Sequence, residues 1–491
     1  MAELEAQARH DPQLPRPDPT ESFWQIPPHP TLSEVQSERL PETTDIAIIG
    51  SGITGCSIAT TLLEHSAQSL KIASVTVLEA RTLTSGATGR NGGVLTSFVP
   101  GDYKVLSERF GHEQAVQIAR YANRTLEKMH ELGNSSDELK KASEVRRLLD
   151  VIGFEDDESF QAAVESWRLY EEHVPEERGK SRILSAEEVE LEYGMRTAAG
   201  AIVWPNGAFW PYRLITSLWA QLYAQNRPRL SIETNTPVTL IAYDAGTNPT
   251  HPYILHTPRG LVRASKVIHA TNGHAGHLLP KLRGSIFPVR GTMSTQKASP
   301  EFGRHGHRVS WSVINSGDFD VATNTIELGL YYGNQNPYTG DIFFGGEKAK
   351  IGELFVSDDS QVGAPCVEKL STLLPSLFTR GWKDGATPDV VKVWSGIMGF
   401  TADRLPLVGC LPPCVTDRGQ EGGEGEWIAA GFNGYGMPLC WSAGEAVAKM
   451  LLGINPDNLL PESFLATKER LQDSRRMATG PALQMLLGGH P

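Results

Sequence analysis

The stretch of the chain from Asp45 to Gly93 constrains the fold more than any other. A short apolar run over residues 46–49 leads into a G-x-G-x-x-G pattern. A helical pattern, a second apolar run over 75–78 and the acid Glu79 then follow. Strand, glycine turn, helix, strand and acid in this order are what a dinucleotide-binding βαβ unit requires. The sequence therefore predicts a Rossmann-like domain that binds a dinucleotide, and the alternative is a glycine turn without a nucleotide.

Each glycine of the pattern is expected to have a distinct structural role. Gly50 permits the tight turn, Gly52 lets a pyrophosphate approach the backbone, and Gly55 lets the helix pack closely on the strand. The helix N-terminus then offers free N–H groups and the positive end of the helix dipole to the phosphates. Glu79 stands where its carboxylate can accept hydrogen bonds from an adenosine ribose.

A second glycine-rich segment, ARTLTSGATGRNGG, follows Glu79. Its composition is poor for a helix or a strand and favours a loop whose backbone lies against a ligand. A nicotinamide enzyme has no special need of this loop, whereas the phosphates and ring of a flavin extend past the first turn. Here the sequence resembles the D-amino-acid oxidase-like family of FAD-dependent oxidoreductases, which includes glycine oxidase, sarcosine oxidases and gamma-glutamylputrescine oxidoreductase. The SGATGRNGG segment is most similar to that of the last.

A second strand–glycine–helix pattern lies near the C-terminus. An apolar run over 427–430 leads into Gly431, Gly434 and Gly436, and a helical pattern with small residues on one face follows. Its helix N-terminus can face the negative charge that a reduced flavin gathers at N1 and C2=O. The resemblance covers roughly residues 44–455, with one glycine pattern near each end.

The length of 491 residues exceeds one comfortable core, so two domains are expected. The expected fold class is α/β, with a Rossmann-like FAD-binding domain interleaved with an α+β substrate domain built on an antiparallel sheet. Local patterns predict helices over 103–192 and 211–225 and mostly strands over 283–393. The predicted divisions are an extended N-terminal arm (1–43) that Phe23 and Trp24 partly pin to the body, a FAD-binding domain (44–105, 205–282 and 395–455), a substrate domain (106–204 and 283–394) and a C-terminal tail (456–491).

Composition excludes several function classes. A formal charge of −12 without a basic run argues against nucleic acid. The apolar stretches are too broken to span a membrane, the first twenty residues lack the apolar core of a signal peptide, and the last three are not a peroxisomal tripeptide. Five scattered cysteines fit a reducing compartment, so a cytoplasmic protein is expected. No metal site is expected, because neither His274 with His277 nor Cys410 with Cys414 has enough further ligands nearby.

The resemblance implies a set of residues that hold FAD. The flavin is expected to be non-covalent, because Met398 stands where sarcosine oxidases carry the linking cysteine and no histidine follows Glu79. Cys410 or Cys414 remains as an alternative linking residue. The implied cofactor-binding residues are Gly50, Ser51, Gly52, Ile53, Thr54, Gly55, Glu79, Ala80, Arg81, Ser85, Gly86, Ala87, Thr88, Arg90, Asn91, Gly92, Gly93, Val238, Thr271, Asn272, Gly399, Asn433, Gly434, Tyr435, Gly436 and Met437.

The resemblance also implies the reaction, which is oxidation of a C–N bond in an amine or amino acid to an imine by hydride transfer to flavin N5. FAD carries this redox step itself, and the chain has no G-x-S-x-G, H-E-x-x-H or Walker A pattern. The candidate catalytic residues are Arg90, Asn91, Tyr332, Trp394 and Tyr435.

Several of these candidates have a structural alternative. Arg90 either neutralises flavin or substrate charge or pairs with a carboxylate, and Trp394 lies either near the ring or in a core between domains. Tyr331, Tyr332 and Tyr338 are candidates to line the substrate site, although neighbours on a strand face opposite sides. Arg290 is a candidate to reach an acidic substrate.

The expected partners are a small amine or amino acid and an electron acceptor, either oxygen or another. Oxidase and dehydrogenase both stay open, because Phe343 replaces the lysine that promotes the oxygen reaction in some relatives. Lys348 and Arg90 are the other cations to consider. Two further alternatives are a flavoenzyme doing other oxidative chemistry in a biosynthetic pathway and a flavoprotein whose FAD is structural and whose role is binding.

Overall fold

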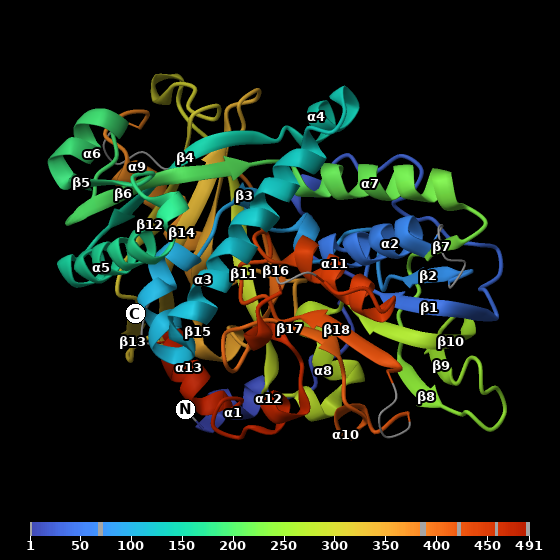
Figure 1. Cartoon of the computed structure of the whole chain (residues 1–491). Helices are drawn as coiled ribbons and strands as arrows, with labels where there is room; N and C mark the ends of the chain where they lie inside the picture. The colour runs from blue at the N-terminus through green and yellow to red at the C-terminus, as the bar shows by residue number, and fades with distance from the viewer. Residues whose placement is uncertain (1, 67–71, 383–388, 420–423, 457–459, 488–491) are drawn as a thin grey trace.

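Two sheets form the frame of the molecule, and helices pack around them (Figure 1). The computed structural model describes residues 2–66, 72–382, 389–419, 424–456 and 460–487. Sheet A lies at the right of Figure 1 with α2 and α7 along one side, and sheet B lies at the left. The first and last helices, α1 and α13, lie beside each other at the lower left.

Sheet A is mostly parallel, as a Rossmann-like domain requires. Neighbouring strands from β18 to β7 run parallel, whereas β17 pairs antiparallel with β18, and β8 and β9 form an antiparallel branch on β10. In spatial order its strands are β17 (Leu407–Cys410), β18 (Glu426–Ala430), β10 (Gly260–His269), β1 (Thr43–Ile49), β2 (Val75–Leu78) and β7 (Leu230–Glu233), with β9 (Tyr253–Thr257) and β8 (Leu240–Tyr243) on the branch.

Sheet B is antiparallel except for the pair β12–β4, and its strands come from two separate parts of the chain, 94–208 and 286–401. In spatial order they are β16 (Asp389–Thr401), β11 (Ile286–Lys297), β15 (Asp341–Lys350), β14 (Thr325–Gln335), β12 (Val309–Ile314), β4 (Arg146–Phe154), β6 (Gly200–Ala208) and β3 (Val94–Leu95), while β13 (Asp318–Asp320) pairs with β14 and β5 (Arg182–Ser185) with β6.

The helices complete the two layers. The long helix α3 has a break at Gly111, where φ is +81°. No helix in the described part of the chain is long and apolar enough to cross a membrane. The helices are α1 (Ala2–Ala8), α2 (Ile53–Ser66), α3 (Val99–Gly133), α4 (Asp137–Ser143), α5 (Asp157–His173), α6 (Ala186–Tyr193), α7 (Pro211–Asn226), α8 (Ala275–Leu278), α9 (Ala364–Leu377), α10 (Pro413–Thr416), α11 (Cys440–Leu451), α12 (Lys468–Gln472) and α13 (Thr479–Leu487).

The first glycine pattern folds as predicted. The run 46–49 lies in β1, the run 75–78 is β2, and α2 begins at Ile53. Gly50 has φ +108°, and a Cβ atom on Gly55 would lie 2.1 Å from the Gly50 carbonyl oxygen. Strand and helix therefore pack so closely that only glycine fits at Gly55.

Three expectations differ from the structure. The region 103–192 is helical in α3, α4, α5 and α6 but also contains the strands β4 and β5, because β4 is buried between β12 and β6. The arm is not extended throughout, since α1 buries Leu4 and Ala8 beside α13. The division proposed at residue 395 falls inside β16, which pairs with β11 along its length.

Candidate active site

The carboxyl ends of parallel strands β1, β2, β10 and β18 lie at one edge of sheet A. The 50–55 glycine turn, Glu79, the 271–273 turn and the 431–437 glycine segment each follow one of these strands. Ligands of open α/β sheets bind at this edge. The fold therefore gathers both glycine patterns and the acid into one site.

Glu79 is buried and already accepts three hydrogen bonds. Its Oε2 accepts from the N–H and the hydroxyl of Ser51, at 3.0 and 2.7 Å, and its Oε1 accepts from the Arg81 N–H at 3.0 Å. A carboxylate oxygen has room for two donors, so Oε1 keeps a lone pair for one more. The acid thus shapes the turn and still has an acceptor position to offer.

The N-terminus of α2 has backbone donors to spare. Thr88 Oγ1 accepts from the Ile53 N–H at 3.1 Å. The N–H groups of Thr54 and Gly55 donate to no residue in the described part of the chain. Helix starts with such N–H groups attract anions.

In the segment 85–93 the backbone carbonyls are bonded within the protein, whereas several backbone N–H groups are available to a ligand. Every backbone carbonyl from Ser85 to Gly92 accepts a hydrogen bond from the protein. In contrast, four of its N–H groups donate to no described residue, and these belong to Gly86, Ala87, Thr88 and Asn91. The Ser85 hydroxyl is also buried and has no hydrogen-bond partner in the described part of the chain. The segment therefore offers donors only, which suits a ligand rich in acceptors.

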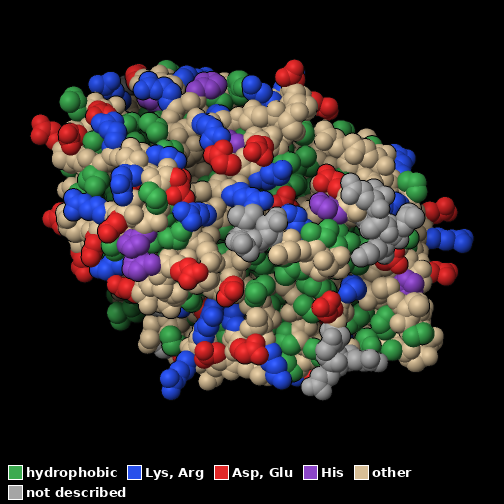
Figure 2. Space-filling model, viewed as in Figure 1, with side chains coloured by type: hydrophobic (Ala, Val, Ile, Leu, Met, Phe, Trp, Pro, Cys, Tyr) green, Lys and Arg blue, Asp and Glu red, His purple; other side chains and the backbone are tan. Residues whose placement is uncertain are grey.

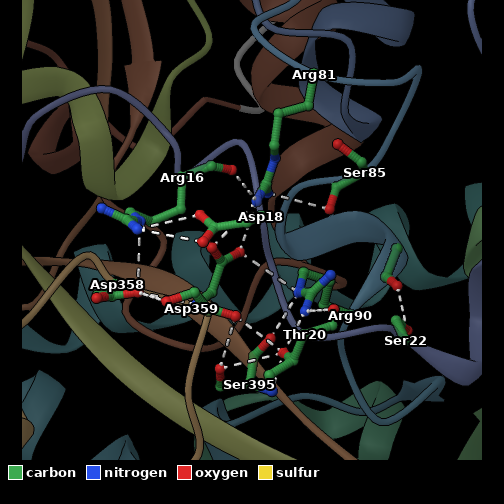
Figure 3. A network of polar contacts seen from close by, with 12 residues as sticks. Arg16, Asp18, Thr20, Ser22, Arg81, Ser85, Arg90, Asp358, Asp359 and Ser395 are labelled. Atoms are coloured by element: carbon green, nitrogen blue, oxygen red, sulfur yellow. Dashed lines mark hydrogen bonds and ion pairs between the residues drawn. The ribbon is translucent and has the colours of Figure 1, made fainter.

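Arg90 forms part of a buried ion network (Figure 3). Asp359 lies 2.9 Å from Arg81 Nη1 and 3.5 Å from Arg90 Nε, and all three side chains are less than 10% exposed. Arg90 also donates to the Ser395 carbonyl at 2.6 Å. Burial lowers the pKa of Arg90 to about 10, and Asp359 opposes that shift. The carboxylate pairing considered as an alternative for Arg90 is what the structure contains.

An aromatic cluster stands beside this segment. The Trp394 indole is fully buried and donates to the Arg90 carbonyl at 2.9 Å. Tyr332 lies against Gly92, where a Cβ atom would meet its ring at 2.5 Å. The whole cluster consists of Phe23, Trp24, Trp210, Tyr212, Met293, Tyr332, Phe343 and Trp394.

Other candidates for the substrate wall lie elsewhere. Tyr331 faces the opposite side of β14 and packs under α9, as strand geometry predicts for neighbours. Tyr338 is 68% exposed and packs on His307. Arg290 pairs with Glu353 at 3.3 Å. Only Tyr332 among the three tyrosines reaches the 85–93 segment.

Asn272, Gly399 and Asn433 meet at the C-terminal glycine segment, whereas Val238 lies elsewhere. Asn272 Oδ1 accepts from the Gly431 N–H at 3.0 Å and blocks a Cβ atom on Gly399 at 2.5 Å. Asn433 donates from its backbone to the Gly399 carbonyl at 2.8 Å. The helix of this pattern, α11, begins only at Cys440. Val238 packs on β1 and β2 in the cluster that includes Ala47, Ile49 and Leu78.

A hollow of about 440 Å³, its open mouth included, adjoins this segment. Tyr435 lines it and packs on Phe98 with ring centres 5.0 Å apart. Arg404 also lines it, in a left-handed conformation with φ +61°. The sequence did not predict that Arg404 and Phe98 belong to the site, because neither residue lies in a recognisable motif.

The structure gives the surroundings of the cysteines and histidines that were considered as ligands or linking residues. Cys410 pairs with Trp427 across β17 and β18, at the end of β18 away from Gly431 and roughly 13 Å along the strand. Cys414 is exposed. His274 bonds the Gln13 carbonyl, and His277 lies 3.0 Å from Asp11. Within the described ranges, no group of three potential ligands is placed to hold a metal ion.

Comparison with known proteins identifies relatives over most of the chain. Residues 45–450 match the model of the family described as FAD dependent oxidoreductase, DAO. The chain is 22% identical over 444 residues to a probable oxidoreductase, OrdL, of Rhizobium meliloti, which covers 87% of both chains. It is 24% identical over 424 residues to gamma-glutamylputrescine oxidoreductase of Escherichia coli, which covers 84% of both.

Solved structures share the fold. Glycine oxidase from Geobacillus kaustophilus superimposes with a TM-score of 0.62 at 20% identity and covers 87% of this chain and 99% of its own. The L-proline dehydrogenase of P. horikoshii gives 0.59 at 19% identity and covers 87% of this chain and 98% of its own. At these identities the likeness is one of fold.

Proposed function

This chain belongs to the DAO family of FAD-dependent oxidoreductases, and we propose that it oxidises a C–N bond of an amine or amino acid to an imine. FAD, when bound, would supply the hydride acceptor for this oxidation, at its N5 atom. Relatives named for a glutamylated amine, glycine and proline support a substrate with a C–N bond. The imine then hydrolyses in water to a carbonyl compound and an amine or ammonia.

The observation that carries this proposal is the donor face of residues 85–93. FAD has two phosphates and several ring oxygen and nitrogen atoms that accept hydrogen bonds, so a site that holds it needs many donors. The unpaired N–H groups of this segment and of Thr54 and Gly55 match that need. The Thr271 hydroxyl, in the turn after β10, is likewise buried and has no partner among the described residues. We infer that these groups hold the cofactor.

The chain's own residues then prepare the substrate. Tyr332, Trp394 and Met293 form an apolar wall that excludes water and keeps a substrate amine neutral. Burial raises the pKa of Tyr332, so its hydroxyl stays protonated near pH 7 and can orient the amine by a hydrogen bond. Glu79 accepts from the ribose through its remaining lone pair on Oε1. The net charge of the Arg81–Arg90–Asp359 network is positive, which favours an anionic cofactor nearby.

We further propose that the flavin is held without a covalent bond. Met398 lies between Gly291, whose Cβ atom would be 3.0 Å from its methyl carbon, and Gly434, whose Cβ atom would be 3.5 Å from its sulfur. A thioether cannot form the link that a cysteine forms. Burial raises the pKa of Cys410 to about 11, which keeps that thiol protonated and unreactive.

The test starts from the purified protein. It should carry about one FAD per chain that acid releases, and a secondary amine or an amino acid should bleach the flavin without oxygen. The bleaching rate should rise with pH until the substrate nitrogen is neutral, because an ammonium has no lone pair to assist hydride loss. A colourless protein that binds NAD contradicts the cofactor, and a substrate panel in which only alcohols bleach the flavin contradicts C–N oxidation. Mixing the reduced protein with oxygen then separates an oxidase from a dehydrogenase.

A further inference from the structure

The N-terminal arm packs directly on the segment proposed to hold the flavin. The family match begins at residue 45, so the arm (1–43) lies wholly outside it. Yet Thr20 to Gln25 run along the carbonyl side of residues 85–93. This part of the arm was expected to be pinned by Phe23 and Trp24, and both belong to the aromatic cluster.

Three side chains of the arm bond backbone carbonyls of the segment. Ser22 Oγ donates to the Gly89 carbonyl at 2.7 Å, and Gln25 Nε2 donates to the same carbonyl at 3.0 Å and to that of Ser85 at 3.2 Å. The Trp24 indole donates to the Asn91 carbonyl. Apart from Arg81, which also bonds Ser85, the arm supplies the only side-chain donors to these three carbonyls within the described residues.

Two glycines of the segment have the arm among their close contacts. A Cβ atom on Gly89 would lie 2.6 Å from the Thr84 carbonyl oxygen and 2.8 Å from Gln25 Nε2. One on Gly93 would lie 2.8 Å from the Phe209 carbonyl oxygen and 3.0 Å from the Trp24 ring. Gly93 also has φ +67°. The sequence predicts that the backbone of this loop lies against a ligand, and in the structure Gly89 and Gly93 also have close protein neighbours. Segment and arm therefore fit each other as two surfaces.

The arm also closes the buried ion network (Figure 3). The Thr20 hydroxyl accepts from Arg90 Nη2 at 2.6 Å and from the Ser395 N–H at 3.0 Å. The Thr20 N–H donates to the Asp359 carbonyl at 2.7 Å. If the arm undocked, Arg90 would lose its hydrogen bond to Thr20, and the carbonyls of Gly89 and Asn91 would lose their side-chain donors. Only water could replace these partners.

We propose that the N-terminal arm is a clasp behind the flavin-binding segment: while docked it holds residues 85–93 in the form that binds FAD, and FAD leaves faster when it undocks. This inference rests on the proposed function insofar as FAD is the ligand. The arm fixes the carbonyl side of residues 85–93, and that fixes the opposite N–H side, which faces the ligand. Holding the donors in place before binding lowers the entropy lost on binding and so raises affinity. The same contacts oppose release.

A reversible tether tests the clasp. Thr20 Oγ1 and Ser395 Oγ lie 3.4 Å apart, close enough for a disulfide after a small shift when both residues are replaced by cysteine. FAD release from the T20C/S395C protein is followed by flavin fluorescence, with the oxidised and the reduced forms of one preparation compared. We expect release from the oxidised form to be at least tenfold slower. The reduced form is the control for the two lost hydroxyl groups.

A second variant should speed FAD release while leaving the packing of the aromatic cluster nearly unchanged. Trp24→Phe keeps an aromatic ring but removes the indole donor to the Asn91 carbonyl, and FAD release should be several-fold faster than from the wild type. Glu34→Ala, at an exposed position on the arm, is the matched control and should release FAD at the wild-type rate.

The outcomes separate the two proposals. Equal release rates from the oxidised and reduced tether overturn the clasp while FAD binding stands, and so does a Trp24→Phe protein that matches the wild type. A protein that holds no FAD in any form overturns the proposed function, and the clasp with it.

Discussion

The ring of Tyr332 lies so close to Gly92 that a Cβ atom on the glycine would be 2.5 Å from Cε2 of the ring. Met293 lies on the same side, with its methyl carbon 3.3 Å from that position. Gly92 does not have a positive φ, so the need for glycine here is one of space and not of backbone conformation. Sheet B and the segment 85–93 therefore meet at this contact.

Gly92→Ala should push Tyr332 and Met293 away from the segment. Overpacking of this kind costs roughly 1–3 kcal/mol of stability. Misplacement of the wall by about 1 Å should slow substrate-driven flavin reduction by on the order of a hundredfold. Stopped-flow reduction and urea unfolding measure the two effects. Gly246→Ala is the control, because a Cβ atom there meets only Asp244 at 3.5 Å, and an unchanged reduction rate in Gly92→Ala would contradict the packing argument.

Glu79→Ala should weaken FAD binding about tenfold or more, because hydrogen bonds to a charged acceptor are worth roughly 1.5–3 kcal/mol each. The structure adds a second cause, since the variant also frees the Ser51 and Arg81 N–H groups that shape the turn. Equilibrium dialysis measures the affinity, with the exposed Glu64→Ala as control. Unchanged affinity would show that Glu79 is not the ribose acceptor.

The elements around Gly50 could be predicted because their signals are local. One short stretch contains all of them: an apolar run, a glycine that no other residue can replace, and an acid four residues after the start of the second strand. The β4 strand could not be read in this way. Its sequence RRLLDVIGF starts with two arginines among charged helices, and what makes it a strand is pairing with β12, more than 150 residues later in the chain.

Asp359 shows the same limit for the site. It lies in a stretch, GELFVSDDSQ, that carries no motif, and its partner Arg81 is 278 residues away. Nothing local distinguishes it from Asp358 beside it. For the arm a weak signal did exist, because an aromatic pair, Phe23 and Trp24, in an otherwise polar and proline-rich region indicates a docked segment.

Asp359→Asn should destabilise the protein far more than Asp358→Asn. The first change leaves two buried guanidinium groups, those of Arg81 and Arg90, without their carboxylate, and breaking a buried pair from one side costs about 3–5 kcal/mol. Asp358 is 41% exposed and its nearest cation, on Arg16, is 3.9 Å away, so its loss should cost less than about 1 kcal/mol. Urea unfolding of the two variants side by side measures the difference. Equal losses would mean that the network does not depend on Asp359.

Glu347 offers a test of pH dependence. The side chain is 3% exposed, its Oε2 accepts from the Thr292 hydroxyl at 2.9 Å, and its Oε1 has no partner among the described residues. Burial raises its pKa to about 8, against the weaker lowering effects of Thr292 and Arg290. The folded protein therefore holds a proton on Glu347 at pH values where the unfolded chain has lost it.

The sign of the effect follows from that proton. Between about pH 4.5 and 8 the folded state binds one proton more than the unfolded state at this group, so its contribution to stability is complete below about 4.5 and is lost as pH rises to 8. Glu347→Gln resembles the protonated side chain and does not titrate. The stability of the variant relative to the wild type should thus increase with pH across this window, by at most about 1.4 kcal/mol per pH unit.

Urea unfolding at pH 5, 6.5 and 8 measures this difference in the free energy of unfolding. Contributions from the other titrating groups are common to both proteins and cancel in the difference. The exposed Glu108→Gln is the surface control, and a flat difference for Glu347→Gln would mean that its carboxylate is ionised in the folded protein.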